Sequence, residues 1–134
     1  MHVHVFLHSC EKCTKSLALL DSGATENFMM LTYAQYLRLP IHELNVSRLL
    51  YNVDGTINKA GEIHWYMDLK VQTGMQHTWM CFFLSDIGQH KIILGYPWFA
   101  VVQPKINWQH AWIDITHLPI VLRAKDAAKA RFLP

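Results

Sequence analysis

The chain has 134 residues, 51% of them hydrophobic and 16% charged, and its formal net charge is +2 with histidine neutral. This composition supplies enough apolar side chains for one core and too little charge for a disordered protein. Lysine and arginine form no basic stripe, and no apolar run approaches the length of a membrane span. We therefore expect one globular domain that binds neither nucleic acid nor a membrane.

The N-terminal segment predicts two strands that lead to a turn. His2 to Leu7 alternates valine and leucine with other side chains, which favours a strand. The polar run from 9 to 15 predicts a loop. Ser16 to Leu20 predicts a buried strand that runs straight into the turn signal Asp21-Ser22-Gly23.

The middle of the chain predicts a helix and two hairpins. Apolar residues at helical spacing predict a helix over 31–39, which Pro40 ends. Asp54-Gly55 stands between β-forming residues, so a hairpin is predicted over 49–57. A second strand pair is predicted over 63–71 and 77–84, joined around Gly74.

The C-terminal third predicts short elements and a tail. A strand is expected over 91–94, and Pro97 can begin a short helix that lasts to residue 102. Further strands are expected over 106–108 and 112–115. Residues 1–120 are interpreted as the domain and 121–134 as a tail or linker. Short strands, hairpins and one or two short helices together predict an all-β, barrel-like fold.

Two short motifs carry the chemistry. In the first, an apolar strand delivers Asp21, and Ser22, Gly23 and Ala24 follow, so a hydroxyl stands beside the carboxylate and a peptide backbone has room to approach. The second is the apolar run that ends in Ile93-Leu94-Gly95. The hairpin around Asp54-Gly55 lies between them in the sequence.

This order of motifs resembles the retropepsins, and most closely the proteases of gypsy-type LTR retrotransposons. The resemblance rests on Ala18 to Thr25 and the following Glu26-Asn27-Phe28, on the hairpin, on Ile92 to Trp98 and on Pro104 to Trp108, and it covers roughly residues 16 to 115. It implies a retropepsin-like closed β-barrel that forms half of a protease, with a flap hairpin and one or two short helices.

The resemblance also implies roles for single residues. Asp21 would be the catalytic residue, and Ser22 and Gly23 would support the pair of aspartates. The loop that meets the aspartate would contain Ile93, Leu94 and Gly95. Contacts to the substrate would come from two segments, Gly23, Ala24 and Thr25 in the first and Asn52, Val53, Asp54, Gly55 and Thr56 in the flap.

A single Asp-Ser-Gly motif implies two chains. Hydrolysis of this kind needs two carboxylates that share a proton, one activating a water and the other polarising the carbonyl group. Because neither Asp54 nor Asp86 stands in a comparable motif, the second aspartate must come from a second copy. The resulting hypothesis is a homodimeric aspartic endopeptidase that cleaves a retroelement polyprotein and uses no metal and no other cofactor.

Two alternatives remain open from the sequence. The first is a catalytically inactive, domesticated retropepsin fold that only dimerises or binds peptides. The second is a zinc or redox site at Cys10 and Cys13, although no second ligand pair with metal-site spacing follows. An odd number of cysteines, three, indicates a reducing compartment, so we expect a cytoplasmic protein or one enclosed in retroelement particles.

Overall fold

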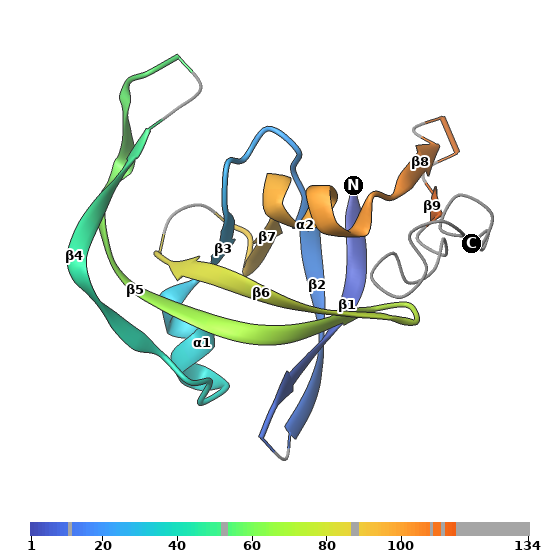
Figure 1. The fold of residues 1–134 in the computed structure, drawn as a ribbon, viewed down its shortest axis with the longest axis horizontal. Helices are drawn as coiled ribbons and strands as arrows, with labels where there is room; N and C mark the ends of the chain where they lie inside the picture. The colour runs from blue at the N-terminus through green and yellow to red at the C-terminus, as the bar shows by residue number, and fades with distance from the viewer. Residues whose placement is uncertain (11, 52–53, 87–88, 108, 111, 115–134) are drawn as a thin grey trace.

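A computed structural model describes residues 1–10, 12–51, 54–86, 89–107, 109–110 and 112–114. Six strands form a closed barrel in the order β1-β2-β7-β3-β6-β5, which the pairing of β1 with β5 closes, and β4 extends the sheet beyond β5 (Figure 1). The elements are β1 (His2–Ser9), β2 (Lys12–Leu20), β3 (Asn27–Met29), α1 (Leu31–Tyr36), β4 (His42–Tyr51), β5 (Ile57–Thr73), β6 (Gln76–Leu84), β7 (Ile92–Leu94), α2 (Tyr96–Val102), β8 (Lys105–Asn107) and β9 (Trp112–Asp114). The predicted all-β barrel is confirmed.

The prediction of a loop over 9–15 is wrong. β1 and β2 form a tight hairpin in which Ser9 faces Lys12, and the turn begins at Cys10 with a φ of 39°. The polar residues after the turn are in β2 because every second residue of that strand faces the core, including Ser16, Ala18 and Leu20. Cross-strand pairing therefore outweighs the polar composition.

The first helix is shorter than predicted. α1 ends at Tyr36 instead of residue 39, because Arg38 takes a left-handed φ of 58° and turns the chain. Leu37 and Leu39 still reach the core from this turn. The apolar spacing therefore predicted correctly that Leu37 and Leu39 are buried, but it predicted a helix that is too long.

Strands β4 and β5 are much longer than the predicted hairpin arms. The separate strands predicted up to 57 and from 63 form one strand, β5, which contains Gly61 at a φ of 69°. The pairing of β4 with β5 shifts register twice. The strand predicted over 77–84 is confirmed as β6, and Gly74 stands in the turn before it at a φ of 60°. β3 was not predicted.

The C-terminal elements confirm the predicted order. β7 and α2 follow as expected, with Pro97 in the first turn of α2. β8 and β9 pair antiparallel, although the predicted positions at Trp108 and Ile115 lie outside the described residues, as does the predicted tail. In the described residues, no helix is long and apolar enough to cross a membrane.

The strands of the barrel and α2 enclose one core. Its largest fully buried side chains come from β1, β3, β5, β6, β7 and α2, namely Trp98, Phe82, Leu7, Met29, Ile63, Met67, Leu69, Leu84, Ile92, Leu94, Val5 and Val71. Trp98 and Met29 are in the core, whereas Met30 is only half-buried. The core fixes β2 and β7 beside each other, and these two strands support the candidate site.

Candidate active site

Asp21 is an exposed residue at the first position after β2. β2 runs parallel to β7, and the Asp21 N–H donates to the carbonyl oxygen of Leu94 at 3.0 Å. The carboxylate oxygen Oδ1 accepts the Gly23 N–H at 3.0 Å, and the main-chain oxygen accepts the Ala24 N–H at 3.0 Å. The aspartate is therefore held at the end of the barrel with its carboxyl group open to solvent.

Gly95 packs directly against the chain that follows the aspartate. A Cβ atom at Gly95 would overlap the carbonyl oxygen of Glu26 and would lie 2.8 Å from that of Ala24. Real Cβ atoms do not approach so closely, so only glycine fits without a shift of the backbone. The next N–H, of Tyr96, donates to the Ala24 oxygen at 2.8 Å. The two predicted motifs therefore meet, as the resemblance implied.

The buried side-chain amide of Asn27 also holds Gly95 against the segment that follows the aspartate. The side chain of Asn27 is fully buried, and its Oδ1 accepts the Gly95 N–H at 2.8 Å. Its Nδ2 donates to the sulfur of Met80 at 3.3 Å and to the Cys81 oxygen at 3.5 Å. Asn27 stands in a segment that carries the family resemblance, but no structural role was predicted for it, although an amide beside Phe28 and two methionines indicates a buried partner.

The flap hairpin consists of β4, β5 and the connection over 52–56. Asp54 Oδ1 accepts the Thr56 hydroxyl at 2.6 Å and the Thr56 N–H at 2.9 Å, and Gly55 takes a φ of 89°. These bonds, the hydroxyl first, lower the pKa of Asp54. The predicted substrate residues Asn52 and Val53 lie outside the described residues.

Residues 21–26, between β2 and β3, form the aspartate loop. A groove of about 600 Å³ separates this loop from the flap hairpin. Both segments extend to the same end of the barrel (Figure 1). The residues that line the groove come from the aspartate loop and from the end of β4, namely Gly23, Thr25, Glu26, Arg48, Leu49, Leu50 and Tyr51. Of the predicted contacts, Gly23 and Thr25 are in this lining, whereas Asp54, Gly55 and Thr56 are in the connection beyond it.

Glu26 and Arg48 link the two sides of the groove. The Arg48 guanidinium lies 3.5 Å from the Glu26 carboxylate and 4.5 Å from the ring centroid of Phe83. The Glu26 side chain is 31% exposed and the Arg48 side chain 53% exposed, so water screens this ion pair strongly. The sequence did not predict this pair, because the two residues are 22 positions apart and no local pattern joins them.

At the alternative site of Cys10 and Cys13, the described residues offer no further ligands. Both thiols are free and exposed, and in the part of the chain that the structure describes no group of three or more histidine, cysteine or acidic side chains is arranged to hold a metal ion. Cys81, the third cysteine, has a pKa raised by burial and by the carboxylates of Asp68 and Glu26. This environment disfavours a reactive thiolate.

The family model of the PEG10/RTL1 protease domain matches residues 17–118. The chain belongs to this family. The family is retropepsin-like and derived from gypsy retrotransposons, which confirms the resemblance found in the sequence. No curated protein matches the chain.

Solved structures confirm the retropepsin-like fold. EIAV protease in complex with the inhibitor HBY-793 superimposes with a TM-score of 0.59 at 15% identity, covering 80% of this chain and 91% of that protease. The retroviral protease-like domain of Ddi1 from Leishmania major superimposes with a TM-score of 0.54 at 18% identity, with 84% and 85% covered. At these identities the similarity establishes the fold.

Proposed function

We propose that this retropepsin-like domain is an aspartic endopeptidase that is active as a homodimer. The observation that carries the proposal is the exposed Asp21 at the end of β2, held by Leu94 and bordered by an open groove. A functional pair of carboxylates needs a second aspartate. A twofold axis beside Asp21 would supply the same residue from a second copy.

The chemistry follows from two carboxylates at short distance. Two such groups about 3 Å apart cannot both be ionised, so they hold one proton between them. The ionised aspartate takes a proton from a water, which attacks the peptide carbonyl, and the protonated aspartate donates to the carbonyl oxygen. The Gly23 N–H and the Leu94 carbonyl oxygen fix the orientation of each Asp21. This mechanism requires no metal.

The groove suits an extended peptide. Gly23 offers backbone without a side chain on one side, and Leu49, Leu50 and Tyr51 offer apolar surface on the other. Ala24 has less to offer, because its N–H donates to Asp21 and its carbonyl oxygen accepts from Tyr96. The descent of the family from gypsy retrotransposons supports a retroelement polyprotein as the substrate.

The decisive experiment is peptide cleavage by the purified protein and by Asp21→Asn, with a library of fluorogenic peptides and with pepstatin as inhibitor. We expect cleavage that pepstatin inhibits and EDTA does not, and its loss in Asp21→Asn. Asp54→Asn, the same change at an exposed aspartate outside the groove lining, should keep most activity. Sedimentation equilibrium should show that both variants dimerise like the wild type.

Two results would refute the proposal. Cleavage by Asp21→Asn at the wild-type rate would assign the chemistry to another group. A wild-type dimer that binds peptides but cleaves none of them would instead support the non-catalytic peptide-binding module.

A further inference from the structure

The barrel is closed by a short pairing of β1 with β5, which we call the seam. Close to the turn between β5 and β6, it joins three residue pairs, namely Phe6 with Gln72, Leu7 with Val71 and His8 with Lys70 (Figure 1). The neighbouring pairings are longer, with eight pairs between β1 and β2 and nine between β5 and β6. Since few paired residues hold the seam, the barrel should open there at the lowest cost in free energy.

One side-chain hydrogen bond crosses the seam. His8 Nε2 lies 2.8 Å from Gln72 Oε1, and Gln72 Nε2 donates to the carbonyl oxygen of Gly74 at 3.0 Å. Because the amide nitrogen is directed at Gly74, the amide oxygen faces His8, and His8 Nε2 is the donor. An imidazole that carries its proton on Nε2 and a doubly protonated imidazolium can both donate this bond. The bond therefore keeps His8 at the seam in either charge state.

Three basic side chains gather at the seam. His77 of β6 pairs with Gln72, and its ring lies 5.5 Å from the ring of His8, centroid to centroid. Lys70 pairs with His8 from the other side of the seam. Partial loss of hydration, the charge of Lys70 and that of His8, in this order, lower the pKa of His77 from its ordinary value of 6.5. A proton on His77 therefore meets other positive charge.

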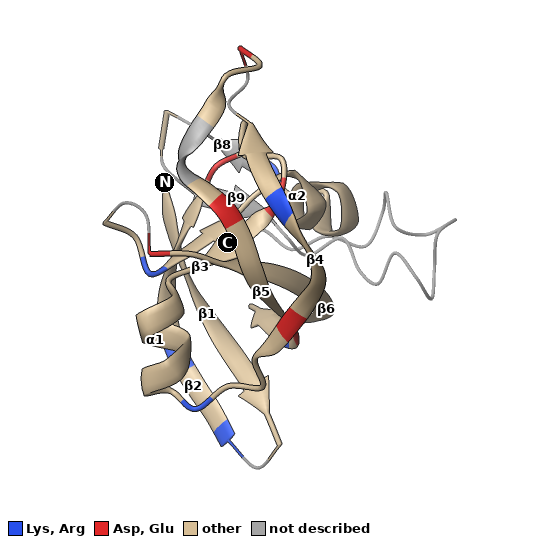
Figure 2. Cartoon of the chain, turned by 90° about the vertical axis from the view of Figure 1, so that its left-hand side faces the viewer, with Lys and Arg blue, Asp and Glu red and all other residues tan. Residues whose placement is uncertain are grey.

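In the described residues, no carboxylate compensates this charge. The side chains opposite His8 and Lys70 are the thiol of Cys13 and the indole of Trp79. Asp68 is two positions from Lys70 on β5, but it is not among the groups that shift the pKa described above. Over the whole molecule, by contrast, basic and acidic positions are interspersed (Figure 2). The imbalance is therefore a local property of the seam.

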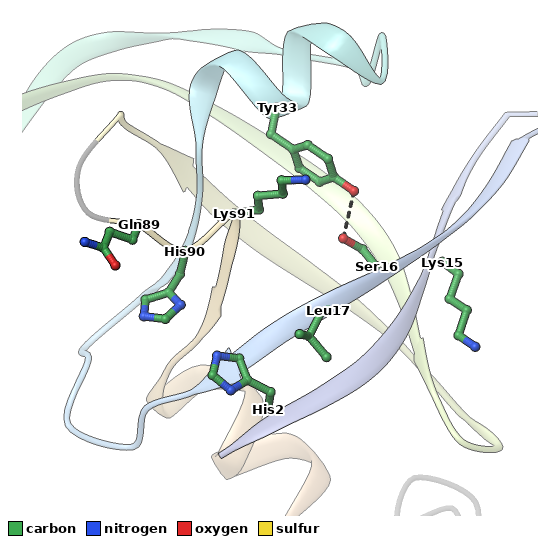
Figure 3. A pocket seen from close by; sticks show the side chains of 8 residues that line it. All are labelled: His2, Lys15, Ser16, Leu17, Tyr33, Gln89, His90 and Lys91. Carbon is green, nitrogen blue, oxygen red and sulfur yellow. Dashed lines mark hydrogen bonds between the residues drawn. The ribbon is translucent and has the colours of Figure 1, made fainter.

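A second pair of histidines lacks this arrangement. The rings of His2 and His90 lie 5.4 Å apart, nearly the same separation as in the seam. Lys91 follows His90 in the chain, but its ammonium lies 4.9 Å from the centre of the Tyr33 ring and is turned toward that ring instead of the imidazoles (Figure 3). This pair lies outside the seam and serves as a matched control.

We propose that the seam is a pH-sensitive closure of the barrel, which loosens when His8 and His77 become protonated. Acidification adds positive charge to imidazoles beside Lys70, and like charges repel across the shortest pairing of the barrel wall on which β1 and β5 depend. Because the pKa of His77 is lower in the folded chain, its contribution to stability is complete above the unfolded value of 6.5. It is lost as the pH falls through the folded value.

The seam connects the supports of the two regions that border the groove. β1 pairs along its length with β2, at whose end Asp21 stands, and β5 is one arm of the flap hairpin. Loosening of the seam would therefore weaken the connection between the flap hairpin and the strand that positions Asp21. The inference does not rest on the proposed peptidase activity, because it concerns the strand pairing alone.

The test is amide hydrogen exchange of the full chain, followed by NMR at about pH 7.5 and about pH 5. Protection factors correct for the intrinsic effect of pH on exchange. For the amides of 6–8 and 70–72 that pair across the seam, we expect protection to fall about twofold to fivefold, the range for interactions between exposed charges. Protection in 18–20 and 80–82 should change less, and high salt should reduce the fall at the seam.

Matched variants assign the effect to the seam. His77→Gln should remove most of the fall in protection. Lys70→Gln removes one cause of the pKa shift, so the titration midpoint of the His77 ring should rise toward 6.5. His90→Gln makes the same change in the second histidine pair and should keep the fall seen in the wild type. A circular dichroism spectrum of each variant confirms that it is folded.

Four results would overturn the inference. They are a wild-type His77 midpoint at or above 6.5, unchanged protection at the seam on acidification, a fall in protection that is equal throughout the barrel, and an equal effect of His77→Gln and His90→Gln.

Discussion

The aspartate loop and the flap hairpin face the same groove but are held in opposite ways. The aspartate loop is tied to distant parts of the chain, through Asp21 to Leu94, Tyr96 to Ala24 and Gly95 to Asn27. The bonds described in the flap connection instead join residues two positions apart. Side chains in its arms, including Val46, Tyr51 and Ile57, are more than half exposed.

This difference fits the two tasks that the proposed peptidase function gives to these regions. A group that does chemistry must keep its orientation, and long-range bonds to a packed core give it the stability of the whole fold. A segment that covers a substrate must open to admit it, and a hairpin with few buried contacts opens at low cost in free energy. If this comparison is correct, equivalent substitutions in the two regions should differ in effect.

The largest difference is expected between two glycines. Gly95→Ala places a Cβ atom against the backbone of Glu26 and Ala24, which cannot move without disturbing Asp21. We expect a loss of about 4 kcal/mol or more in the free energy of unfolding. Gly61→Ala in β5 meets nothing within 4 Å and adds only the strain of a positive φ, about 1–2 kcal/mol. Urea denaturation measures both, and equal losses would contradict the comparison.

The second largest difference is expected between two asparagines. Asn27→Ala leaves the buried Gly95 N–H without its acceptor and opens a small cavity, so we expect a loss of about 2–3 kcal/mol. Asn45→Ala changes an exposed side chain of β4 and should stay within about 0.5 kcal/mol of the wild type. Denaturation midpoints compare them. A tolerated Asn27→Ala would mean that the contact between Gly95 and the aspartate loop does not depend on this amide.

The sequence predicted the aspartate loop better than the flap, and the reason is physical. Asp21, Gly23 and Gly95 stand in short motifs because their chemistry and close approach permit few other residues. The extent of β4 and β5 depends on pairing between distant segments, which no local pattern encodes. The polar start of β2, predicted as a loop, is likewise a strand because it pairs with the end of β1.

Residues that join separate elements were the hardest to predict. Asn27 gave a weak signal as a lone amide in an apolar run, but its partner, the Gly95 N–H, is 68 positions away. Arg48 gave none, because an arginine in an exposed strand is ordinary and Glu26 is in a different motif. Residues within one local motif were therefore predictable, and the bonds that join two distant segments were not.

A smaller effect is expected where the two regions touch. A double-mutant cycle with Arg48→Met and Glu26→Gln should give a coupling of about 0.2–1 kcal/mol, because both side chains are partly exposed. High salt should reduce it. Arg48→Met alone should lose a further contribution from Phe83, about 0.5–1 kcal/mol. Glu62→Gln is the control, since the Glu62 carboxylate lies 3.7 Å from Nε2 of His64 on the same strand, β5.

The smallest effect is expected at the flap connection. The Thr56 hydroxyl and N–H lower the pKa of Asp54, so its titration, followed by NMR of the side chain, should have a midpoint below the ordinary value of 3.8. Thr56→Val removes the larger cause and should raise the midpoint toward 3.8. Because the pKa is lower in the folded chain, the stabilisation is complete above the unfolded value and is lost as the pH falls through the folded one.

The location of Asp54 limits what this loss can do. The carboxylate is fully exposed, and among the described residues its hydrogen bonds go to Thr56 of the same connection, so the pH drop should loosen the flap connection and leave the barrel intact. Amide exchange should therefore quicken at Thr56 in Asp54→Ala, while Asp21 and Leu94 keep their wild-type protection. If protection fell equally in both regions, the flap and the aspartate loop would form one cooperative unit. The contrast between a rigid aspartate loop and a flap hairpin that opens independently would then be wrong.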